Sequence, residues 1–110
     1  METPIQILIV EDEFITQRTI ANQLEEMGYQ IAGLAMSSEE AIAILNSKKV
    51  NFAILDINIQ GENDGIWLAN FIKEKHNIPF IYLTAYADDD TIKRAITTEP
   101  FSYLVKPFQK

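Results

Sequence analysis

The sequence predicts an α/β fold in which a doubly wound, five-stranded parallel sheet carries helices on both faces. Short apolar runs alternate along the chain with segments of helical period, and this alternation is typical of parallel strands joined by helical crossovers. The 110 residues suffice for one hydrophobic core, and a composition of 47% hydrophobic and 23% charged residues is that of a globular chain. No repeat or linker-like stretch interrupts the pattern. We therefore expect one domain over residues 1–110.

The first half of the chain supplies two strands and two helices. Residues 5–10 form a nearly continuous apolar run, as expected of a strand covered on both faces. A helix from about Phe14 follows, with apolar side chains at helical spacing, and Gly28 ends it. Residues 29–35 read as the next strand. The S-x-x-E pattern that begins at Ser37 is a capping box and opens the second helix.

The second half continues the alternation. Residues 52–55 are a third strand, and the polar loop after it ends at Asp64, which can cap a helix. Residues 80–84 are a fourth strand. The three aspartates at 88–90 suit a helix N-terminus, where negative charge is favoured, and residues 102–105 are the fifth strand. The expected order is therefore β-α-β-α-β-α-β-α-β.

Charge and composition exclude several classes of function. Acidic residues outnumber basic ones 16 to 9, so direct binding of nucleic acid by this segment is not expected, because phosphate contacts need a basic surface. The absence of cysteine excludes disulfides and thiolate metal sites. No apolar run approaches the ~20 residues that span a bilayer, and the N-terminus has no signal-like pattern. We expect a cytoplasmic protein without a membrane partner.

Ionisable and hydroxyl side chains follow the predicted strands. Glu11 and Asp12 follow the first strand, Asp56 the third and Lys106 the fifth, while Thr84 ends the fourth. Because ligands of such sheets bind at the carboxyl ends of the strands, these side chains are candidates for one site. Converging carboxylates without His or Cys suit a hard cation, Mg²⁺ first, and a lysine with a hydroxyl suits a phosphate. The pattern predicts metal-assisted phosphoryl transfer to Asp56.

Four segments carry a resemblance to a known family: ILIVEDE, FAILDINIQGENDG, IPFIYLTAY and YLVKPF. In this order and spacing they resemble the receiver domain of response regulators in two-component signal transduction, over nearly the whole chain. The resemblance implies the flavodoxin-like receiver fold. It also implies a phosphoprotein that acts as a signalling switch, alone or within a phosphorelay.

The resemblance assigns the acidic residues. It implies that Asp56 is the phospho-acceptor and that Glu11, Asp12 and Asp56 bind Mg²⁺. The backbone carbonyl of Asn58 would be a further metal ligand. The first acidic position is Glu11, where Asp is commoner in the family, and a glutamate there leaves phosphorylation in place.

The resemblance also assigns residues near the ends of the last two strands. Thr84 and Lys106 would contact the phosphoryl group, and Thr84 and Tyr103 would be the switch residues. Pro107 would follow a cis peptide that aims Lys106 into the site. Because Thr84 and Lys106 lie at strand ends, we expect their side chains to face solvent before phosphorylation.

These assignments imply that the domain acts through protein partners and not on a substrate as an enzyme does. A sensor histidine kinase or a phosphotransfer protein would donate the phosphoryl group. The change would pass to an output domain or a dimer partner through the face of the fourth helix and fifth strand. The domain would be no enzyme beyond self-catalysed phosphorylation and slow autodephosphorylation.

Two other functions are weighed against this one. A haloacid-dehalogenase-like phosphohydrolase also forms an aspartyl phosphate, but it carries a D-x-D pattern after its first strand, where this chain has E-D-E. A degenerate receiver used only for protein interaction would not be expected to keep all five site residues, which are Glu11, Asp12, Asp56, Thr84 and Lys106.

The family normally adds a fifth helix after the lysine–proline motif, whereas only Phe108, Gln109 and Lys110 follow it here. We therefore expect a receiver domain that lacks its C-terminal helix and belongs to a longer protein. One face of the sheet would then be partly bare, with Ile5, Ile7, Leu104 and Phe108 as its apolar residues.

Overall fold

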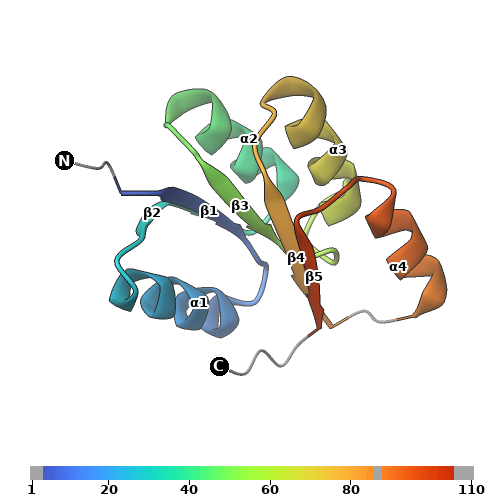
Figure 1. The fold of residues 1–110 in the computed structure, drawn as a ribbon, viewed down its shortest axis with the longest axis horizontal. Coiled ribbons are helices and arrows are strands. Elements are labelled where there is room, and N and C mark those ends of the chain that lie inside the picture. Colours follow the sequence, from blue (N-terminus) through green and yellow to red (C-terminus); the bar gives the residue numbers. More distant parts are fainter. Residues whose placement is uncertain (1–3, 86–87, 106–110) are drawn as a thin grey trace.

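A computed structural model describes residues 4–85 and 88–105, so Lys106, Pro107 and Phe108 lie outside the described residues. Strands and helices alternate throughout, as predicted (Figure 1). None of the described helices combines the length and hydropathy needed to cross a membrane. The elements are β1 (Gln6–Val10), α1 (Phe14–Glu26), β2 (Gln30–Ala35), α2 (Ser38–Ser47), β3 (Phe52–Leu55), α3 (Gly65–Lys75), β4 (Phe80–Thr84), α4 (Asp89–Ile96) and β5 (Ser102–Val105).

The five strands form one parallel sheet in the order β2-β1-β3-β4-β5. The chain moves outward from β1 to β2, then returns past β1 to β3, so the direction of winding reverses between β1 and β3. Helix α1 lies on one face of the sheet, and α2, α3 and α4 lie on the other (Figure 1). The doubly wound prediction is confirmed, and the reversal point is where such sheets bind ligands.

The helix starts predicted from polar caps are confirmed. The side chains of Ser37, Asp64 and Asp88 each accept a hydrogen bond from the backbone N–H three residues on, at 3.2, 2.9 and 3.0 Å. Glu40 accepts a hydrogen bond from the N–H of Met36 at 2.8 Å, one residue before the position of an ideal capping box. Each cap satisfies an N–H that the helix itself cannot pair.

The strand boundaries differ slightly from the predicted ones. Strand β1 begins at Gln6 and β2 at Gln30, each one residue later than expected, because pairing between the two strands starts with these residues. Ile5 lies before the first pair and is 45% exposed. Ile5 is therefore an exposed apolar residue outside the core, although it continues the apolar run of β1.

The face of the sheet that carries α1 has an apolar groove. Among the described residues, α1 is the only helix on this face, whereas three helices cover the other. The groove has a volume of about 270 Å³ and is lined by Ile20, Gln23, Leu24, Met27, Ile54, Ile81, Leu83 and Leu104. Leu104 was expected there. Ile7 was also expected to be bare, but α1 covers it and it is only 4% exposed.

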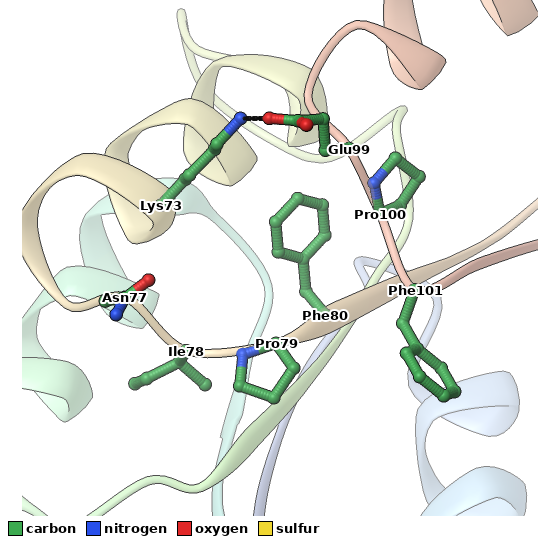
Figure 2. Close-up of a pocket in the computed structure, with 8 residues that line it drawn as sticks. All are labelled: Lys73, Asn77, Ile78, Pro79, Phe80, Glu99, Pro100 and Phe101. Carbon is green, nitrogen blue, oxygen red and sulfur yellow. Dashed lines mark hydrogen bonds and ion pairs between the residues drawn. The ribbon is translucent and has the colours of Figure 1, made fainter.

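A second hollow lies at the opposite edge of the sheet from the ends of β1 and β3. It has a volume of about 460 Å³ and lies between the end of α3 and the loop from α4 to β5 (Figure 2). An ion pair between Lys73 and Glu99 joins the two segments above Phe80. Asn77 and Glu99 take left-handed conformations, with φ of 52° and 58°, where α3 and α4 end. This hollow thus lies where α3 and α4 end, at the edge of the sheet opposite to the predicted phosphoryl-transfer site.

Candidate metal and phosphoryl-transfer site

The hydrogen-bonded ladders of the sheet continue into the acidic residues. Val10, the last residue of β1, pairs with Leu55 of β3 and Ala35 of β2. One residue further, the N–H of Asp56 donates to the carbonyl of Val10 at 2.9 Å, and the N–H of Glu11 donates to the carbonyl of Ala35 at 2.9 Å. The regular sheet therefore sets Glu11 and Asp56 side by side at its carboxyl edge.

Three carboxylates converge at this edge. Glu11, Asp12 and Asp56 each offer one carboxylate oxygen, and these oxygens lie within 4.8 Å of one another. Three carboxylate oxygens this close together could serve as ligands of one Mg²⁺ ion. Glu11 is 1% and Asp56 7% exposed. These two neighbouring carboxylates are therefore largely shielded from solvent. An all-oxygen, negatively charged set of this kind fits Mg²⁺.

Backbone N–H groups orient two of the carboxylates. The N–H of Glu13 donates to Glu11 Oε2 at 3.0 Å, and the N–H of Asn58 donates to Asp56 Oδ1 at 3.1 Å. Each bond closes a turn within two residues and restricts how the carboxylate can rotate. Asn58 thus touches the acceptor through its N–H, while metal ligation by its carbonyl stays a prediction.

Gly65 packs against the backbone of the candidate acceptor, and the sequence analysis missed it. Its N–H donates to the carbonyl of Ile57 at 2.7 Å. A Cβ on Gly65 would lie 2.1 Å from the carbonyl oxygen of Asp56 and 2.8 Å from Ile57 Cα. The first residue of α3 therefore has to be glycine. The sequence signal was the Asp-Gly pair at the start of an apolar helical stretch, interpreted there only as a loop and a cap.

Gln17 is a second residue that the sequence analysis missed. It lies in α1, is 3% exposed, and donates from its side-chain amide to the backbone carbonyls of Glu11 at 3.1 Å and Ala35 at 3.0 Å. The signal was a glutamine on the helix face that otherwise carries apolar residues such as Ile20 and Leu24. A polar residue in such a stripe is informative because it needs partners when buried.

Thr84 and Tyr103 occupy the strands beyond the acceptor. Thr84 ends β4 as expected, but its side chain is fully buried, which corrects the prediction that it faces solvent. Strand β4 lies between β3 and β5, so its last residue is still inside the sheet. Tyr103 is half-buried and its ring lies 5.7 Å from that of Tyr82. Burial raises the pKa of Tyr103, and the negative charges of Asp88 and Asp56 raise it further.

Two hollows flank the β3–α3 loop on the side of α4. One of about 220 Å³ is lined by Ile57, Asn58, Asp64, Thr91 and Arg94. The other is an open trough of about 560 Å³ between α3 and α4, lined by Asp64, Ile66, Trp67, Asn70, Lys93, Arg94 and Thr97. Asp64 and Arg94, which form an ion pair of 3.2 Å, line both hollows. The loop that carries the acceptor is therefore tied directly to α4.

The structure thus brings together Glu11, Asp12 and Asp56 and sets Thr84 at the end of a neighbouring strand. Lys106 and Pro107 lie outside the described residues. Chemically, a carboxylate beside a candidate divalent-cation site at a strand-order reversal is suited to accept a phosphoryl group.

Comparison with known proteins agrees with this geometry. A family model described as the response regulator receiver domain matches residues 7–110. The transcriptional regulatory protein PdtaR of Mycobacterium tuberculosis is 36% identical over 105 residues, which are 96% of this chain and 51% of that protein. The aerobic respiration control protein ArcA of Escherichia coli is 36% identical over 110 residues, 98% of this chain and 44% of that protein.

Solved structures show the same likeness. The signal receiver domain of a modulated diguanylate cyclase from Desulfovibrio desulfuricans G20 superposes with a TM-score of 0.90 at 34% identity, covering 97% of this chain and 85% of that one. A two-component response regulator from Clostridium difficile gives 0.88 at 30% identity, covering 96% and 85%. The chain spans about half the length of the curated relatives that it matches.

Proposed function

Because this chain belongs to the response regulator receiver family, a family of signalling domains and not of classical enzymes, we propose that Asp56 accepts a phosphoryl group in a Mg²⁺-dependent reaction. One observation carries the assignment to Asp56. Its carboxylate converges with those of Glu11 and Asp12 at the point where the strand order reverses. No feature of the described residues favours the phosphohydrolase or a receiver without phosphorylation.

The proposed reaction is a displacement at phosphorus. A carboxylate oxygen of Asp56 forms a bond to phosphorus while the bond to the imidazole nitrogen of a phosphohistidine breaks, and the imidazole leaves and takes up a proton from solvent. When bound, Mg²⁺ supplies positive charge that screens the carboxylates from the incoming phosphoryl oxygens. Glu11 and Asp12 would hold the ion, and the N–H of Asn58 keeps Asp56 oriented.

Thr84 and Lys106 are proposed to contact the phosphoryl group after transfer, the hydroxyl as a hydrogen-bond donor and the ammonium as a charged one. Because Thr84 is buried, its side chain has to turn toward the site. Tyr103, two residues before the pairing partner of Thr84 in β5, Val105, would then move into the room that Thr84 leaves. We propose that this coupled movement is the switch. We propose that self-catalysed phosphorylation and slow autodephosphorylation use these same residues.

The proposed phosphoryl donor is a sensor histidine kinase or a phosphotransfer protein. The proposed output surface is the face of α4 and β5, where Ile96 and Val105 expose large apolar side chains. An output domain or a dimer partner would bind there. We also propose that a further helix of a longer protein fills the apolar groove beside α1, because the groove is lined almost entirely by aliphatic side chains.

The test is phosphorylation by a small donor. The protein is incubated with acetyl phosphate and Mg²⁺, and its intact mass is measured. One added phosphoryl group is expected in the wild type and in the control Asp90→Asn, whose carboxylate is exposed on α4. No addition is expected in Asp56→Asn or with excess chelator. Labelling of Asp56→Asn to the wild-type extent would contradict the assignment.

A further inference from the structure

The side chain of Gln17 lies on the face of α1 that packs on the sheet. Its helical neighbours on this face are apolar, with Ala21 buried and Ile20 and Leu24 packed in the same cluster. Gln17 itself is 3% exposed, so its amide has left water completely. A buried amide lowers the stability of the fold unless its polar atoms are hydrogen-bonded. Core packing alone therefore does not explain a glutamine at this position.

The reason is visible in its hydrogen bonds. The two protons of the Gln17 amide nitrogen go to two backbone carbonyls, that of Glu11 at 3.1 Å and that of Ala35 at 3.0 Å. The carbonyl of Ala35 also accepts the N–H of Glu11 at 2.9 Å. The backbone of Glu11 is thus held at its N–H by β2 and at its carbonyl by α1.

This double hold acts where regular pairing with β2 ends and the acidic turn begins. The carboxylate of Glu11 bonds to the N–H of Glu13, so its direction follows the backbone of the turn. The carbonyl of Glu11 belongs to the same peptide unit as the N–H of Asp12. A shift of this peptide would therefore move two of the three converging carboxylates with respect to Asp56. Mg²⁺ demands near-ideal octahedral geometry, so its binding is sensitive to such shifts.

We propose that Gln17 is a positioning residue for the metal site. It does not contact the ion, but its amide holds the Glu11–Asp12 peptide in the position from which both carboxylates reach the ion. The inference rests on the proposed function, because it presupposes that the acidic cluster binds Mg²⁺. Loss of such an outer partner typically weakens metal binding 10–100-fold.

The experiment compares two identical substitutions on one helix. Gln17→Met removes the amide at nearly constant volume. Gln23→Met makes the same change six residues further along α1, where the side chain lines the apolar groove and not the metal site. Mn²⁺ binding is measured by electron paramagnetic resonance, with Mg²⁺ as competitor, and melting is recorded in chelator. We expect about 10–100-fold weaker binding in Gln17→Met and binding within about twofold of wild type in Gln23→Met.

The outcomes separate this inference from the proposed function. Wild-type affinity in Gln17→Met, even with a lowered melting temperature, would show a purely structural residue and overturn the inference. Failure of the wild type to bind Mn²⁺, or undiminished binding in Asp12→Asn, would instead overturn the proposed site. If Gln17→Met does not fold, Gln17→Asn keeps an amide but withdraws it by one methylene. The same weakening is expected, and wild-type affinity there is equally decisive against the inference.

Discussion

Replacing Gly65 by alanine tests how closely α3 is built against the acceptor. The new Cβ would lie 2.1 Å from the carbonyl oxygen of Asp56, about 1.3 Å inside an ordinary contact of roughly 3.4 Å. The opposing atoms are backbone, so the helix or the acceptor loop has to move. Such overpacking costs about 3 kcal/mol, and alanine returns up to about 1 kcal/mol of helix propensity. We expect a net loss of about 2 kcal/mol, or a melting temperature lowered by about 8 °C.

In Gly65→Ala, the rate of phosphorylation should be affected more strongly than the free energy of unfolding. A displacement of about 1 Å at a reacting group can cost about 10²-fold in rate, so phosphorylation of Gly65→Ala by acetyl phosphate should slow by that order below its melting range. The matched control is Gly33→Ala in β2, where the three atoms nearest to a new Cβ all belong to the side chain of Ile44, the nearest at 2.7 Å. That side chain can rotate, and the site lies elsewhere. A Gly65→Ala protein that melts and phosphorylates like the wild type would refute the reasoning.

Three further predictions concern the switch, the core and the groove. Lys106→Ala should fold normally but lose the conformational change on phosphorylation; a variant that switches normally, as judged by protease sensitivity, would exclude the proposed role. Burial raises the pKa of Tyr82 from its ordinary 10 to about 12, so the unfolded chain loses this proton first and stability should fall by about 2 kcal/mol as the pH rises from 10 to 12. Urea denaturation at the two pH values should show this fall less strongly in Tyr82→Phe, which also loses its 2.7 Å bond to Thr98; an equal fall in both proteins would count against the burial argument. Adding a C-terminal amphipathic helix of about 12–15 residues should raise the melting temperature if a helix fills the groove beside α1, and calorimetry showing no change would rule that out.

Local features of this fold could be predicted from the sequence because their causes are local. The caps at Ser37, Asp64 and Asp88 accept hydrogen bonds from N–H groups three residues later in the chain. A short sequence pattern contains both partners of such a bond. Asp56 could be placed at the sheet edge for a similar reason, since an apolar strand directly precedes it. The convergence with Glu11 then follows from parallel pairing.

The features that could not be predicted depend on contacts between distant segments. The burial of Thr84 follows from the position of β4 between two other strands, which the residues of β4 alone do not encode. The need for glycine at position 65 arises from the close approach of a helix to the strand end before it, and φ is not the cause. Gln17 bonds to Ala35, 18 residues later, across two elements. Such requirements appear only once the chain is folded.

The trough between α3 and α4 contains Trp67, the single tryptophan of the sequence, stacked on Phe71 with ring centroids 5.7 Å apart. Its far wall belongs to α4, through Lys93 and Arg94. The only indole of the sequence therefore lies beside α4, which together with β5 forms the proposed output surface. If the excitation wavelength is one that tyrosine does not absorb, a change in indole emission on adding a phosphoryl donor would report a change around this trough in real time, without a label and from one known place in the molecule.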